Sequence, residues 1–121
     1  MIRMKRVYEP AESADGARFL VDRLWPRGIK KDALSLKAWL KDVAPSNELR
    51  NWYHASSDQW NEFRRRYFEE LESNRETWMP LAEAARKGDI TLLYSSKEAL
   101  HNNATALGEF LEAKVSKTKV R

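Results

Sequence analysis

The sequence predicts a small α/β domain with a mainly parallel sheet of about three strands flanked by about five helices. The chain has 121 residues, 42% of them hydrophobic, which is room for one core and for a single domain over residues 1–121. Short apolar runs typical of buried strands alternate with longer segments of helical periodicity. The order strand, helices, strand, helix is that of a parallel-sheet fold.

The strands are predicted from apolar runs bounded by turn-forming residues. A first strand is expected from Met4 to Glu9, ending at Pro10, and its pairing direction stays open. A second is expected from Ala17 to Leu24, because residues 19–21 are continuously apolar, as in a strand covered on both faces. The clearest strand is Asp89 to Ser95.

The helices follow from capping residues and apolar spacing. Ser35 and Ser46 are expected to cap two short helices. The strongest helix is predicted for residues 58–73, and a further helix ends at Gly88 and either begins or kinks at Pro80. The last helix is expected to bury one stripe of side chains: Leu100, Ala104, Leu107 and Leu111.

Composition excludes several classes of function. Without cysteine the chain has no disulfide, thiolate nucleophile or zinc–thiolate site. No apolar run approaches the roughly 20 residues of a membrane helix, and the first residues lack the apolar region of a signal peptide. The expected location is therefore the cytoplasm, with no membrane partner.

The positive charge is unevenly distributed along the chain. The formal net charge is +4, but all acidic residues lie between Glu9 and Glu112, so this middle part is net acidic. The basic excess falls at residues 1–6 and 114–121, and we expect flexible ends at about residues 1–3 and 114–121. One local exception is the segment from Arg23 to Lys31, whose charged side chains are all basic.

The first candidate site is the run from Asp22 to Gly28, at the end of the second predicted strand. Ligands of open α/β sheets bind beyond the carboxyl ends of the strands. Arg23 and Arg27 offer planar guanidinium forks for phosphate or carboxylate, and Trp25 offers a ring for stacking. Asp22 would orient an arginine or a histidine. The alternative is structural: Asp22 forms an ion pair and Trp25 belongs to the core.

The second candidate site follows the strand at Asp89–Ser95. A strand end that leads into a helix favours anions, because the first backbone N–H groups of the helix are free. His101 would act there as general acid or base; alternatively, Ser96 caps the helix and His101 bonds a loop carbonyl. His54 is a weaker candidate and more typical of a turn. The other residues assigned to ligand binding here are Tyr94, Ser95, Ser96, Lys97 and Asn102.

Several longer motifs resemble a known family. They are Asp22-Arg23-Leu24-Trp25-Pro26-Arg27-Gly28, Ala44-Pro45-Ser46, Leu49-Arg50-Asn51-Trp52, Trp60 with Phe63-Arg64-Arg65-Arg66-Tyr67, Leu92-Leu93-Tyr94-Ser95-Ser96-Lys97 and His101-Asn102-Asn103-Ala104. Over about residues 4–112 the chain resembles the YeaO-like proteins, a short branch of the bacterial domain-of-unknown-function family 488. The resemblance implies a small α/β domain of the bacterial cytosol with no assigned activity. In longer relatives the positions of Asn102 and Asn103 resemble a Cys-His-Arg motif, and those of Tyr94-Ser95-Ser96 resemble a cysteine-containing strand end. This chain departs from both patterns, so no thiol chemistry is carried over.

Three functions are compatible with these patterns. The first is binding of, or reaction with, a small phosphate- or carboxylate-bearing ligand. In this reading Arg23 and Arg27 hold the anion and His101 moves a proton, while Asp22 orients an arginine or the histidine. The second is a nucleic-acid-binding or regulatory module that uses the segment from Arg23 to Lys31. The third is a structural or interaction protein without ligand chemistry. No phosphate loop, metal-ligand spacing or cofactor motif is present, so we expect neither metal nor cofactor.

Overall fold

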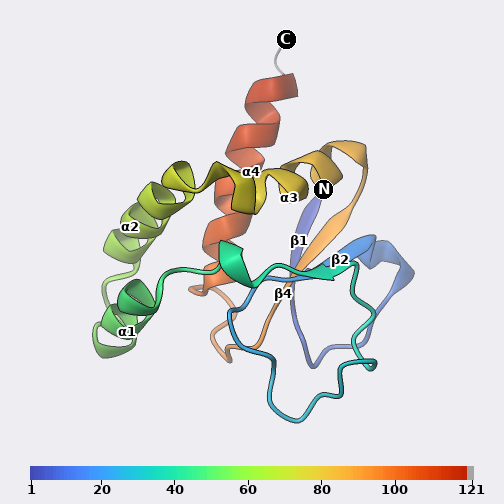
Figure 1. Cartoon of the computed structure of the whole chain (residues 1–121), viewed down its shortest axis with the longest axis horizontal. Helices are drawn as coiled ribbons and strands as arrows, with labels where there is room; N and C mark the ends of the chain where they lie inside the picture. The colour runs from blue at the N-terminus through green and yellow to red at the C-terminus, as the bar shows by residue number, and fades with distance from the viewer. Residues whose placement is uncertain (120–121) are drawn as a thin grey trace.

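The computed structural model describes residues 1–119 and shows one parallel sheet with helices packed against it (Figure 1). The strands are β1 (Ile2–Arg6), β2 (Ala17–Leu20), β3 (Ala38–Trp39) and β4 (Ile90–Tyr94). The helices are α1 (Asn47–Ala55), α2 (Trp60–Ser73), α3 (Arg75–Lys87) and α4 (Asn103–Lys119). The predicted α/β class is confirmed, with four strands and four helices in the described part of the chain.

The sheet has the order β1-β4-β2-β3, and every described pair of strands is parallel. The central strand β4 is buried at each of its five positions. In register, Arg6 pairs with Tyr94 and Leu20 pairs with Leu93, so β1, β2 and β4 end at one edge. Parallel strands that end together place their following loops side by side, and the candidate site therefore forms at this edge.

The two faces of the sheet are covered differently. Alternate residues of β4, among them Ile90 and Leu92, join the main core with apolar side chains from all four helices. Leu93 points to the other face and packs with Val7, Leu20 and Leu34. That face is covered by the long connection between β2 and β3, which contains no helix (Figure 1).

The prediction of a helix after Ser35 is wrong, because this segment contains the edge strand β3. The Lys37 N–H donates to the Arg18 carbonyl at 2.7 Å, and the Leu40 N–H donates to the Leu20 carbonyl at 2.9 Å. The Ser35 carbonyl accepts the Arg18 Nε–H at 3.0 Å. Pairing with β2 therefore outweighs the local preference for a helix.

The first strand begins and ends earlier than predicted. Ile2 is buried and pairs with Ile90, so β1 includes Ile2 and Arg3 of the segment expected to be a flexible end. Arg3 donates to the Ala14 carbonyl at 2.7 Å and lies 3.6 Å from a carboxylate oxygen of Asp89. The second strand also ends early, at Leu20 instead of Leu24.

The C-terminal segment expected to be a flexible end overlaps helix α4. This helix continues to Lys119, Val115 is buried, and Lys114 pairs with Glu72 at 2.9 Å. Residues 120–121 of that expected end lie outside the described residues.

Two further details of the helices correct or refine the predictions. Leu100, expected in the buried stripe of the last helix, is 72% exposed because α4 begins only at Asn103; Ala104, Leu107 and Leu111 are buried as predicted. Helix α3 begins at Arg75 and runs through the exposed Pro80. No helix in the described residues is long and apolar enough to cross a membrane.

Candidate functional site

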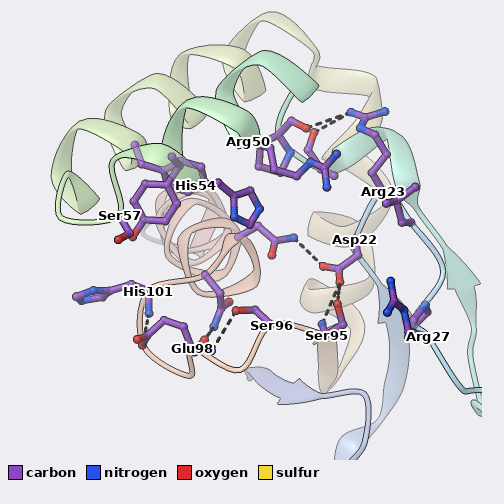
Figure 2. A pocket seen from close by; sticks show the side chains of 18 of the residues that line it. Asp22, Arg23, Arg27, Arg50, His54, Ser57, Ser95, Ser96, Glu98 and His101 are labelled. Atoms are coloured by element: carbon purple, nitrogen blue, oxygen red, sulfur yellow. Dashed lines mark hydrogen bonds between the residues drawn. The ribbon is translucent and has the colours of Figure 1, made fainter.

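A cavity of about 660 Å³ lies where β2 and β4 end and α1 and α4 begin (Figure 2). Three segments contribute most of its lining: residues 22–27 after β2, residues 95–103 between β4 and α4, and residues 50–57 from α1 onward. Tyr8, Ala44, Pro45 and Phe63 complete the wall. The two strand ends predicted as candidate sites therefore line one pocket.

Most residues predicted for the site line this pocket. They are Asp22, Arg23, Trp25, Arg27, Ser95, Ser96, His101 and Asn102. Tyr94 and Lys97 are not among the lining residues: Tyr94 is buried in the core at the end of β4, and Lys97 is an exposed loop residue. The cavity brings the predicted groups together, and their binding of a ligand stays a prediction.

The Asp22 carboxylate connects the two strand ends. Its Oδ2 accepts hydrogen bonds from the Ser95 N–H at 2.9 Å and the Ser95 hydroxyl at 2.8 Å. Its Oδ1 accepts from Asn103 Nδ2 at 3.1 Å. We expected Asp22 to orient an arginine or a histidine, but its hydrogen-bond partners are a serine and an asparagine. The carboxylate thus joins β2, β4 and the first turn of α4.

Arg23 turns away from Asp22 toward the segment before α1. Its Nη2 donates to the carbonyls of Ala44 and Pro45, both at 3.3 Å, and its buried Nε has no hydrogen-bond partner. No carboxylate pairs with Arg23 in the part of the chain that the structure describes. The guanidinium therefore keeps donor capacity and an uncompensated charge at the pocket wall.

Arg50 is a second arginine of this kind, and we did not predict it. It lies in α1, its Nε is buried without a partner, and none of the described residues forms a side-chain hydrogen bond or ion pair with it. Figure 2 shows Arg23 and Arg50 at the same end of the pocket. The other pocket residues from this segment, Tyr53, His54 and Ser57, follow at intervals of three, four and seven. Within α1 this spacing places Arg50, Tyr53 and His54 on one face, a signal that could have been found in the sequence, whereas Ser57 lies just beyond the end of the helix.

His101 lies at the rim of the pocket. Its ring is exposed and stacks on Trp60, with ring centroids 4.7 Å apart and planes inclined by 14°. Figure 2 shows the His101 ring pointing outward, whereas the His54 ring projects from α1 into the pocket. His101 therefore has no hydrogen bond to Asp22, and the geometry does not support the expected acid–base pair.

Local hydrogen bonds hold the loop between β4 and α4. The Glu98 carboxylate accepts hydrogen bonds from the N–H groups of Leu100 and His101, and these bonds lower the pKa of Glu98. Asn102 is buried, and its Oδ1 accepts the Thr105 N–H at 2.9 Å. Asn102, not Ser96, therefore caps α4; the Ser96 hydroxyl instead accepts the Glu98 N–H.

Aromatic contacts stabilise the loop after β2. Trp25 Nε1 donates to the Ile29 carbonyl at 2.6 Å, and the Trp25 ring meets Trp39 edge-on at 5.4 Å. The Tyr8 hydroxyl donates to the Arg27 carbonyl at 2.8 Å. Trp25, predicted to stack on a ligand, thus has a structural contact with Trp39 while it also lines the cavity.

The charged groups of the pocket are mainly cationic. Arg23, Arg27 and Arg50 line it, whereas its two carboxylates, Asp22 and Glu98, accept hydrogen bonds from neighbouring residues. Within residues 1–119, no group of three or more histidine, cysteine or acidic side chains is placed to hold a metal ion. The arrangement suits an anion held by guanidinium groups.

Comparison with known proteins identifies the family. A family model described as the inactive DUF488-N3 subclade matches residues 1–121. The uncharacterized protein YeaO of Escherichia coli (strain K12) is 46% identical over 112 residues, which cover 93% of this chain and 97% of that protein. The uncharacterized protein Rv3073c of Mycobacterium tuberculosis (strain ATCC 25618 / H37Rv) is 38% identical over 113 residues, 93% of this chain and 95% of that protein. No solved structure matches the chain. The chain therefore belongs to the YeaO-like proteins of the DUF488 family, in the subclade described as inactive.

Proposed function

We propose that this protein binds a small phosphate- or carboxylate-bearing ligand in the pocket, with Arg23 and Arg50 as the groups that hold the anion. The observation that carries the proposal is the pair of buried Nε atoms without hydrogen-bond partners. A buried donor without an acceptor costs about 1–3 kcal/mol, and more when the group is charged. A bound oxyanion would supply the missing negative charge and would accept hydrogen bonds from the guanidinium groups that line the pocket.

Binding is favoured over catalysis. The one histidine predicted as a proton carrier, His101, stacks on Trp60 at the rim, and Asp22 is engaged by Ser95 and Asn103. Among the described pocket residues, no serine hydroxyl donates to a histidine that could act as its base; the Ser95 hydroxyl donates to Asp22 instead. The subclade description as inactive agrees with a binding role.

The proposal is tested by titrating inorganic phosphate, pyrophosphate and citrate into the protein, with calorimetry and amide chemical shifts as readouts. We expect shifts confined to residues around Arg23, Arg50 and Ser95. Arg50→Met, which keeps the length of the stem, should weaken binding at least about tenfold, because it removes a charge-assisted hydrogen bond.

Arg75→Met is the matched control, because Arg75 is an exposed arginine outside the pocket lining. Equal binding by wild type and both variants would contradict the proposal. The nucleic-acid alternative predicts a different pattern: salt-dependent binding of a duplex or single strand that persists in Arg50→Met and falls when the exposed Arg27, Lys30 and Lys31 are replaced.

A further inference from the structure

The pocket has two chemically different parts, and their combination restricts the ligand. The part beside α1 presents guanidinium donors, Arg23 and Arg50. The part between β2, β4 and α4 presents acceptors, the Asp22 carboxylate and the Asn103 amide oxygen. Resting on the proposed function, we propose that the anion is a sugar phosphate, either free or as the ribose phosphate of a nucleotide.

The acceptor part requires a ligand with hydrogen-bond donors. A carboxylate offers about four acceptor positions. Asp22 uses two on Oδ2, for the N–H and hydroxyl of Ser95, and one on Oδ1, for Asn103 Nδ2. One position on Oδ1 is left, and the Asn103 Oδ1 accepts no hydrogen bond within residues 1–119. Inorganic phosphate would leave these acceptors unused, whereas adjacent hydroxyl groups would satisfy them.

The charges of the pocket favour hydroxyl groups over an ammonium group as the donors. Three arginines line the cavity, and both carboxylates accept hydrogen bonds from protein donors. An added ammonium would be repelled by the guanidinium groups, whereas a neutral hydroxyl donates to Asp22 without that penalty. The Asp22 charge also repels the phosphate, so the ligand would bind with its phosphate toward Arg23 and Arg50.

The remaining wall suits a ring. Tyr53 stacks on Phe63 with centroids 4.5 Å apart, which fixes its orientation, and burial raises the pKa of its hydroxyl. His54 projects into the cavity (Figure 2) and has no ring contact or hydrogen bond from its side chain in the described residues. Its face is free for a sugar or base, and a cavity of about 660 Å³ lies in the usual range for small-molecule sites.

The test compares phosphate esters that differ only in their hydroxyl groups. Ribose 5-phosphate and (tetrahydrofuran-2-yl)methyl phosphate share a five-membered ring and a phosphate, but the second lacks the ring hydroxyls. Calorimetric titration of both into the wild-type protein should show ribose 5-phosphate binding at least about tenfold more tightly. Asn103→Ala and Asp22→Asn, each checked for folding by circular dichroism, should reduce the ratio between the affinities for the two esters.

Further ligands separate the remaining outcomes. Equal affinity for the two esters would overturn the sugar-phosphate inference but not the anion site. Phosphoethanolamine binding more tightly than ribose 5-phosphate would also overturn it, in favour of an ammonium group on Asp22. Adenosine monophosphate binding more tightly than ribose 5-phosphate would support the inference with a nucleotide as the source, and equal affinity would support a free sugar phosphate. Binding of citrate but of no phosphate compound would overturn the sugar-phosphate inference and leave the anion site standing. If neither citrate nor any phosphate compound bound, or if Arg50→Met changed none of these affinities, the proposed function itself would fail.

Discussion

Two arginines of this protein, Arg18 and Arg50, show how partners distinguish a structural residue from a functional one. Arg18 is 6% exposed and donates to the Asp15 carboxylate at 2.5 Å and to the Ser35 carbonyl at 3.0 Å. Arg50 also has a buried Nε, but that atom has no partner. A side chain whose donors are satisfied within the fold contributes to stability, whereas buried unsatisfied donors are the observation on which the proposed anion site depends.

We therefore expect the same substitution to affect stability very differently at the two positions. Arg18→Met should lower the free energy of unfolding by about 3 kcal/mol, because it leaves the buried Asp15 without one of its partners. Arg50→Met should change the free energy of unfolding by less than about 0.5 kcal/mol or raise it, because no hydrogen bond or ion pair of the side chain is lost. Urea denaturation of the two variants and the wild type measures both effects. A loss in Arg50→Met as large as that in Arg18→Met would mean that Arg50 is structural.

Residue chemistry in the sequence located part of the site. Arginines directly after an apolar strand predicted the pocket wall at Arg23 and Arg27, because the strand end could be recognised locally. The roles of Asp22 and His101 could not be predicted, because they depend on which loop groups lie opposite. Arg50 and His54 belong to a helix distant in sequence from both strand ends, and only the packing of α1 brings them to the pocket.

Among the elements, α4 depends on a single buried cap. The Asn102 Oδ1 accepts both the N–H and the hydroxyl of Thr105, and its Nδ2 donates to the Glu98 carbonyl. Asn102→Ala should therefore lower the free energy of unfolding by about 1 kcal/mol or more. Asn102→Ser keeps an acceptor for the Thr105 N–H and should recover part of this loss. Urea denaturation measures it, and equal stability of wild type and Asn102→Ala would show that the cap contributes nothing.

The elements also show where a periodic pattern is informative and where it is not. The long helix α2 was recognisable because its apolar residues repeat over several turns. The stretch around β3 is short, and its Leu36 and Trp39 match a helix as well as a strand. What decides is the free backbone edge of β2, which accepts its N–H groups. Such pairing is a property of the sheet, and no local pattern contains it.

At the scale of the whole molecule, linear charge counts misplace the basic residues. The N-terminal basic residues were expected to form a solvated end, yet they lie in β1 and have partners. Lys5 donates to Asp15 and Glu12, and Arg6 donates to the carbonyls of Ser95 and Ser96. The basic excess therefore does not form a patch at this end of the chain.

The Lys5 contacts belong to an ion cluster that also contains the buried Arg18. Asp15 is its centre: its carboxylate accepts from Arg18, Lys5 and the Glu12 N–H, and its carbonyl accepts the Thr91 hydroxyl. Burial alone would raise the pKa of Asp15. The hydrogen bonds and charges of its partners outweigh burial and hold this pKa at about 2, below the ordinary 3.8.

The cluster predicts how the stability of the protein depends on pH. Because the pKa of Asp15 is lower in the folded state, its contribution is complete above pH 3.8 and is lost as the pH falls from there through about 2. Urea denaturation at a series of pH values should show this loss in the wild type. Asp15→Asn should be less stable at neutral pH and should lose less stability on acidification.

Glu62→Gln is the control. The pKa of Glu62 is also about 2, because Arg65 and Arg66 donate to its carboxylate. Its ion pairs lie on the surface, however, where such pairs stabilise little. An Asp15→Asn variant with the same acid sensitivity as the wild type would show that the cluster does not control acid stability.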